Sequence, residues 1–255
     1  MRGVFAPDQP MVYNEIMIRA WYSHLMALEN DVRVDQAAAP GEDEIGYQAG
    51  RLPVLLSAPH AARHVRAGQL KHGEPMTAGL ARWVAEETGA HVLYLRRRTS
   101  GDPNSDFHSP YKQALRAAHA QTPFCFMVDV HGASDRHNFG LALGSMGGQS
   151  CARLLPEILA ALAEQGFSPR GRGLLRVDLD EKFKGLGSPA RETLTRFAWH
   201  ELHLPCLQVE IHAHLRDTQA QSELKRTAAA LRALVLAAAA AAADCCSEPY
   251  GTTLK

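Results

Sequence analysis

Three apolar segments of the sequence end in side chains that bind metal ions or transfer protons. They are residues 52–60 (LPVLLSAPH), 124–132 (FCFMVDVHG) and 204–212 (LPCLQVEIH). Runs of this kind are typical of buried strands. The first ends at His60, and the second ends with Asp129 and His131 close together. The third carries Glu210. Ligands collect beyond the carboxyl ends of strands in open α/β sheets, so these side chains predict one shared active site.

The two histidines predict a catalytic metal site. Such a zinc site needs three protein ligands, from histidine and carboxylate, and one open position. His60 and His131 each end a predicted strand and are followed by a small residue that leaves access. We predict Glu74 as the third ligand, because the loop that leaves His60 is long enough to fold its carboxylate back over the strand ends. His64 and His72 in the same loop are alternative ligands.

Two carboxylates beside the predicted ligands have separate expected roles. Alternation with a period of two places Asp129 on the same side of its strand as His131, where it would hold the unliganded nitrogen of an imidazole. Glu210 points into the same crevice and is the predicted general base. The structural alternatives are a turn cap for Asp129 and an edge salt bridge for Glu210. Burying a carboxylate in an apolar strand is costly, which favours a functional role for Glu210.

Substrate selection requires cations or amides close to the metal. Asn104 follows a proline-fixed turn in a long loop, so its side chain is positioned to bind substrate. Lys112 and Arg136 are the other candidates, because a cation can hold a substrate carboxylate. The triple arginine at 96–98 reads as a solvated surface from which at most one side chain points inward.

The elements that must position these residues alternate between strand and helix. This alternation predicts an α/β fold with a mostly parallel sheet covered on both faces. We expect one domain over residues 1–255, with a peripheral segment at 1–40 that contains a helix and then a loop. Functional loops are expected at 61–75 and 96–111. Further strands are expected at 91–95, 139–145 and 174–178, and helices at 76–89, 112–119, 151–164, 192–200 and 219–243.

The composition excludes several classes of protein. Lysine plus arginine and aspartate plus glutamate both number 27, and a chain without excess positive charge is not expected to bind nucleic acid. No apolar run reaches the length of a membrane span, so no membrane partner is expected. The five cysteines show no zinc-finger or redox spacing, which predicts a cytoplasmic setting.

Five motifs together resemble the N-formylglutamate amidohydrolase family, whose members are related in fold to the zinc carboxypeptidases. The resemblance covers roughly residues 52–217. It implies a three-layer α/β/α sandwich around a mixed sheet, with zinc as the cofactor. The motifs are SAPH at 57–60, Glu74 ahead of a helix, GDPN at 101–104, DVHG at 129–132 and QVEI at 208–211.

The resemblance also implies roles for individual residues. By similarity, His60, Glu74 and His131 would hold the zinc and Glu210 would be the base. The family's activity is hydrolysis of N-formyl-L-glutamate to formate and glutamate. One position departs from the pattern, because family members tend to show an Asn-Arg pair where this chain has Asn104 followed by serine.

The expected function is therefore a zinc-dependent amidohydrolase that uses metal-activated water on a small acidic N-acyl amino acid. Lys112, Arg136 or one of the loop arginines would supply the missing cation. One alternative is a carboxypeptidase-like or peptidoglycan-directed zinc hydrolase with an open groove. Another is a ligand-binding protein that keeps the fold without catalysis. The sequence does not predict the oligomeric state.

Overall fold

The computed structural model describes residues 9–246, and it is built around a seven-stranded sheet with the strand order β10-β9-β11-β8-β3-β6-β2. The four central strands run parallel to one another, whereas β9 and β2 are antiparallel to β11 and β6. The sheet is therefore mixed and mostly parallel, as predicted. The strands are β2 (Ile45–Gln48), β3 (Leu52–Ala58), β6 (Ala90–Leu95), β8 (Phe126–Ala133), β9 (Leu141–Gly144), β10 (Val177–Leu179) and β11 (Cys206–His212).

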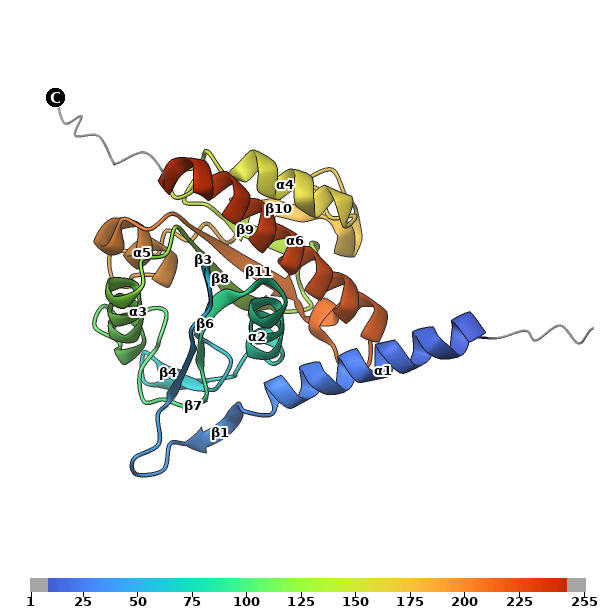
Figure 1. Cartoon of the computed structure of the whole chain (residues 1–255). Helices are drawn as coiled ribbons and strands as arrows, with labels where there is room; N and C mark the ends of the chain where they lie inside the picture. Colours follow the sequence, from blue (N-terminus) through green and yellow to red (C-terminus); the bar gives the residue numbers. More distant parts are fainter. Residues whose placement is uncertain (1–8, 247–255) are drawn as a thin grey trace, which may run out of the picture.

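Helices cover both faces of the sheet (Figure 1). On one face lie α2, α4 and α6, and on the other lie α3 and α5, which confirms the α/β/α sandwich. The helices are α1 (Gln9–Glu29), α2 (Thr77–Thr88), α3 (Pro110–Gln121), α4 (Leu155–Glu164), α5 (Leu194–Leu202) and α6 (Gln221–Cys246). Each predicted helix is present, with ends that differ by a few residues. Among the described residues, no helix is long and apolar enough to cross a membrane.

The three strands that carry the predicted site residues are neighbours in the sheet. Strand β8 lies between β3 and β11, and nearly every residue of the three strands is buried. The register places Ser57 of β3 and Gln208 of β11 opposite Asp129. It also places Glu210 opposite His131. Because these strands are parallel, their carboxyl ends meet at the same end of the sheet.

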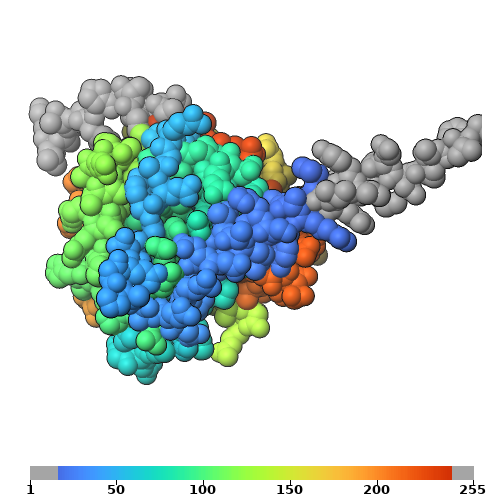
Figure 2. Space-filling model, turned by 60° about the horizontal axis from the view of Figure 1, so that its bottom comes forward, coloured from blue at the N-terminus to red at the C-terminus, as the bar shows by residue number. Residues whose placement is uncertain are grey.

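Helix α1 is tied to the start of α2. Its last residue, Glu29, accepts hydrogen bonds from the backbone N–H groups of Met76 and Gly79, each at 2.7 Å. These N–H groups have no partner within a helix, so the carboxylate of Glu29 takes the part of a cap. Burial raises the pKa of Glu29 to about 6. Figure 2 shows the described part of α1 and the segment after it (blue) lying across one face of the molecule.

The loop predicted after the helix in residues 1–40 and the loop predicted at 61–75 contain short strands. Strand β1 (Arg33–Ala37) pairs with β7 (Arg97–Arg98), and β4 (His64–Arg66) pairs with β5 (Gln69–Lys71) as a hairpin. The prediction of a strand at 174–178 is wrong in part, because Gly173–Leu175 form a 3₁₀ turn and the strand β10 follows it. These strands are short and polar, so their sequences carry no clear alternation.

Candidate active site

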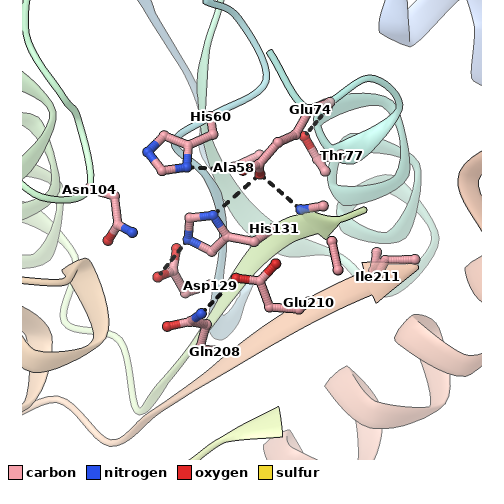
Figure 3. A network of polar contacts seen from close by, with 12 residues as sticks. Ala58, His60, Glu74, Thr77, Asn104, Asp129, His131, Gln208, Glu210 and Ile211 are labelled. Carbon is pink, nitrogen blue, oxygen red and sulfur yellow. Dashed lines mark hydrogen bonds and ion pairs between the residues drawn. The ribbon is translucent and has the colours of Figure 1, made fainter. Parts of the chain in front are cut away.

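Glu74 lies between two imidazoles at the carboxyl ends of the central strands (Figure 3). Its Oε1 is 3.1 Å from Nδ1 of His60, and its Oε2 is 3.3 Å from Nδ1 of His131. His60 follows the end of β3, and His131 lies in β8. The structure thus brings together the three residues that the sequence predicted as metal ligands.

Backbone contacts explain how Glu74 reaches this position. The hairpin β4–β5 turns the chain back toward its start, and the N–H of Glu74 then donates to the carbonyl of His60 at 2.8 Å. The Oε2 of Glu74 accepts a hydrogen bond from the N–H of Gly132 at 2.8 Å. Thr77 donates to the carbonyl of Glu74 at 2.7 Å. Glu74 is therefore bonded to the backbone of both segments that carry the histidines.

A buried aspartate faces the second nitrogen of each imidazole. Nε2 of His60 lies 2.9 Å from Oδ1 of Asp102, and Nε2 of His131 lies 3.3 Å from Oδ2 of Asp129. Both aspartates are fully buried. An aspartate on Nε2 fixes the ring and leaves Nδ1 directed at Glu74, an arrangement common behind metal-binding histidines. Asp129 thus contacts the imidazole that it is expected to hold, and its role there stays a prediction.

Sequence reasoning missed Asp102. The residue was noted only as part of the GDPN turn, because nothing in the local sequence shows that the long loop brings its carboxylate under His60. Its acidic character ahead of a proline-fixed turn was the available signal. In the structure, Oδ1 of Asp102 also accepts hydrogen bonds from the N–H groups of Asn104 and Ser105, each at 3.0 Å. Asp102 therefore shapes its own turn and orients His60.

The charges of the cluster compensate one another. Burial lowers the pKa of both His60 and His131, but the neighbouring carboxylates outweigh it and raise the pKa of each imidazole. Burial raises the pKa of Glu74, but the two imidazoles outweigh it and hold this pKa well below its usual range. The site therefore keeps Glu74 ionised, as a metal ligand must be.

The donor set fits a metal ion. One ligand atom from each of His60, Glu74 and His131 lies within 4.8 Å of the other two. Two imidazole nitrogens with one carboxylate are the donors of a known class of catalytic zinc site. The described residues contain a second such group, His60, His64 and Asp102.

The alternative ligands are placed less favourably than Glu74. The ring of His64 stacks on His60 with centroids 4.0 Å apart, and its Nε2 lies 3.9 Å from Oδ2 of Asp102. The guanidinium of Arg66 contacts Asp102 there, and its Nη2 is 3.4 Å from Nε2 of His60. A metal ion bound beside Asp102 would be repelled by the positive charge of Arg66. His72 is exposed and lies in neither group.

Glu210 lies beside His131 on the adjacent strand (Figure 3). Its side chain is buried, and its Oε1 accepts a hydrogen bond from Nε2 of Gln208 at 2.8 Å. Burial raises the pKa of Glu210 to about 7, a shift that the neighbouring His131 opposes. A carboxyl group with a pKa near neutrality is suited to take up and release a proton.

The predicted substrate-binding residues are less well placed. Asn104 is at the site, and Figure 3 shows its amide nitrogen on the side of His131, while its Oδ1 accepts from the N–H of Leu194 at 2.6 Å. Lys112 is buried, and its Nζ donates to Asp106 and Glu192. The prediction that Lys112 binds substrate is therefore not supported, because all three N–H groups are used.

The remaining predicted cations lie elsewhere. Arg136 is exposed after β8, and no described contact links its side chain to the site. Arg96 pairs with Asp31 at 3.0 Å, and Arg97 pairs with Glu42. Arg66 of β4, which the sequence did not predict as a site residue, contacts Asp102 and comes within 3.4 Å of His60.

Comparisons with known proteins give one matching family model. A family model described as N-formylglutamate amidohydrolase matches residues 96–216, which contain Asp102, Asp129, His131 and Glu210. His60 and Glu74 lie before the matched stretch. No curated protein matches the sequence. The family match supports a hydrolase of the amide-cleaving type.

Several solved structures are similar. A gene product of Agrobacterium tumefaciens has a TM-score of 0.55 at 15% identity, covering 84% of this chain and 100% of its own. The N-formylglutamate amidohydrolase of Ralstonia eutropha has a TM-score of 0.49 at 13% identity, covering 76% of this chain and 97% of its own. A bacteriophage poly-gamma-glutamate hydrolase has a TM-score of 0.46 at 17% identity, covering 88% of this chain and 96% of its own. At 15% identity, the similarity to the Agrobacterium tumefaciens protein shows the fold alone. The chain resembles the N-formylglutamate amidohydrolase family, as its motifs predicted, and the family match covers residues 96–216.

Proposed function

We propose that the protein is a zinc-dependent amidohydrolase that cleaves the amide of a small acidic N-acyl amino acid, such as N-formyl-L-glutamate. The observation that carries this proposal is the position of Glu74 between Nδ1 of His60 and Nδ1 of His131, with Glu210 alongside. His60, Glu74 and His131 would hold the ion. When bound there, zinc supplies polarisation of the amide carbonyl and a lowered pKa of water.

The chain's own residues supply the other parts of the reaction. Glu210 takes the proton of the attacking water and passes it to the leaving amine. Gln208 holds one oxygen of that carboxylate and leaves the other free for proton transfer. Asp102 and Asp129 keep the two imidazoles in the orientation that the ion needs. The amide nitrogen of Asn104, which lies on the side of His131, would donate to the substrate.

Arg66 is the cation best placed to bind a carboxylate of the substrate. Its Nε donates to Asp102, whereas Nη1 makes no hydrogen bond to a described residue, and 29% of its side chain is exposed. The family pattern has an arginine after the asparagine, where this chain has Ser105. A guanidinium that reaches the same turn from β4 compensates for that difference, since arginine binds carboxylates through several N–H groups.

Replacing Arg66 with glutamine is expected to reduce the preference for acidic substrates. The ratio of kcat/KM for N-formyl-L-glutamate to that for its uncharged diamide should fall about 10- to 100-fold, the value of a charge-assisted hydrogen bond. The ratio removes any loss that affects both substrates equally through Asp102. Arg63→Gln is the matched control, because Arg63 is similarly exposed and pairs with Asp35 at 2.6 Å. An unchanged ratio in Arg66→Gln contradicts this role.

The metal content tests the proposed ligands directly. Wild-type protein reconstituted with zinc and dialysed should hold about one zinc per chain, and His131→Ala should lose it. His72→Ala should keep its zinc, since His72 is exposed and outside the cluster. Elemental analysis gives the content. Wild type that retains no zinc, or His72→Ala that loses it, would contradict the assignment.

Substrate range separates the proposal from a carboxypeptidase-like enzyme. N-formyl and N-acetyl amino acids should be hydrolysed in preference to peptides with a free carboxyl end. A zinc-loaded protein that cleaves neither class would be a ligand-binding relative instead.

A further inference from the structure

The guanidinium of Arg216 holds three backbone segments that carry the site. Arg216 ends the 3₁₀ turn Ala213–Arg216, which follows β11. Its Nε donates to the carbonyl of Ile211 at 3.2 Å, Nη1 to that of Pro75 at 3.0 Å, and Nη2 to that of Ala133 at 3.1 Å. The three acceptors come from three separate parts of the chain.

Each acceptor is close in sequence to a residue of the site. Pro75 directly follows Glu74, and Ile211 directly follows Glu210. Ala133 comes two residues after His131. One planar side chain therefore connects the backbones that carry a proposed ligand, a second proposed ligand and the proposed base.

Gly132 lets the guanidinium come this close to β8. A Cβ atom at position 132 would lie 2.6 Å from Cζ of Arg216 and 2.7 Å from its Nε. The same glycine donates its N–H to Oε2 of Glu74. Any larger residue at position 132 would displace Arg216 or shift the strand, so the absence of a side chain here serves the contact.

The charge of Arg216 also suits its surroundings. Burial lowers the pKa of Arg216, while the carboxylates of Glu74, Glu210 and Glu29 raise it. These three carboxylates lie on different elements around the guanidinium. A neutral side chain could not balance them, and a lysine lacks the planar fork that serves three acceptors.

We propose that Arg216 is a positioning residue, which fixes Glu74 against His131 and Glu210 through the three carbonyl groups of Pro75, Ala133 and Ile211. This inference rests on the proposed function only in its consequence for zinc. The position of Glu74 against β8 is a property of the chain itself. Arg216 touches no reacting atom in this proposal.

Amide hydrogen exchange tests the positioning without metal. In Arg216→Gln, the N–H of Gly132 should exchange at least 10-fold faster than in wild type, because its acceptor Glu74 is no longer held in place. Amides of β6, on the far side of β3, should be unchanged. Arg97→Gln is the matched control, since the guanidinium of Arg97 is likewise bonded to backbone carbonyls, those of Asp31 and Arg96, but lies away from Glu74. This variant should leave Gly132 protected.

Zinc affinity tests the consequence for the site. Measured by competition with a chromophoric chelator, the Kd for zinc should rise about 10- to 100-fold in Arg216→Gln and stay within about twofold in Arg97→Gln. Gly132→Ala and Arg216→Lys should fall between, and they carry the test if Arg216→Gln does not fold. Circular dichroism at the assay temperature confirms which variants are folded.

The outcomes separate this inference from the proposed function. If wild type binds no zinc but Arg216→Gln loses the protection of Gly132, the positioning role stands and the proposed function falls. The positioning role is wrong if wild type binds zinc and the folded Arg216→Gln keeps both the protection of the Gly132 N–H and the wild-type affinity for zinc. The same holds for Gly132→Ala and Arg216→Lys if Arg216→Gln does not fold. Equal losses in Arg97→Gln also overturn it, because they would show a general effect of stability.

Discussion

Replacing Glu210 with glutamine is expected to lower kcat at least about 10³-fold while the protein keeps its zinc. Glutamine has the same shape and still accepts the hydrogen bond from Gln208, but it cannot take a proton from water. Glu210 lies opposite His131 on the adjacent strand and has neither a proposed ligand role nor, like Asp129, a contact that orients an imidazole. Steady-state kinetics and elemental analysis on the same preparation give the two values.

The same substitution is expected to stabilise the metal-free protein at neutral and alkaline pH. The pKa of Glu210 is raised by burial to about 7 from 4.5, so the folded state holds a proton that the unfolded state releases. This contribution to stability is complete below pH 4.5 and is lost as the pH rises through about 7. Above that pH, Glu210→Gln should be more stable than wild type by about 3 kcal/mol. Urea unfolding of the metal-free proteins at pH 4.5 and pH 8 measures the difference.

A loss of activity together with a gain in stability in Glu210→Gln would identify Glu210 as a functional carboxylate and not a structural one. Glu181→Gln is the control, because Glu181 is exposed and pairs with Arg176, and it should change neither quantity. A Glu210→Gln protein that keeps more than about a tenth of the activity would mean that another group is the base. A variant less stable than wild type at pH 8 would mean that Glu210 is a structural ion.

The central strands and the residues at their ends could be predicted because the signal is local. Residues 124–132 form a continuous apolar run that ends in Asp129 and His131, and the structure shows a buried strand ending at the site. The same reasoning placed His60 and Glu210. Parallel pairing then required no further information, since the carboxyl ends of parallel strands must meet.

The residues that sequence reasoning missed act across long separations. Asp102 is 42 positions from His60, and the carbonyl of Pro75 is 141 positions from Arg216. No periodicity records such a contact. Lys112 was a wrong prediction for the same reason. A lysine near a predicted site suggests a substrate-binding cation, but the Nζ of Lys112 donates to Glu192, 80 positions away in the sequence.

Replacing Asp102 is expected to affect both the fold and the metal site strongly. The buried carboxylate serves His60, Arg66 and the two N–H groups of its own turn. Asp102→Ala leaves these donors without an acceptor and should lower the free energy of unfolding by about 3–5 kcal/mol. Asp102→Asn retains an acceptor, so it should fold better but bind zinc about 10- to 100-fold more weakly. Chemical unfolding and chelator competition measure the two effects.

The dependence on pH separates the charge of Asp102 from its shape. Burial raises the pKa of this carboxyl group, but His60 and Arg66 outweigh burial and hold it far below the usual range. Its contribution to stability is therefore present above about pH 3.9, the unfolded value, and declines as the pH falls further toward the folded pKa. The difference in stability between wild type and Asp102→Asn should narrow below that pH. Asp106→Asn is the control and should show no such narrowing, because among the described residues the carboxylate of Asp106 accepts a hydrogen bond from the N–H of Asp102 alone. If the difference stays constant down to acid unfolding, Asp102 acts through hydrogen-bond geometry and not through its charge.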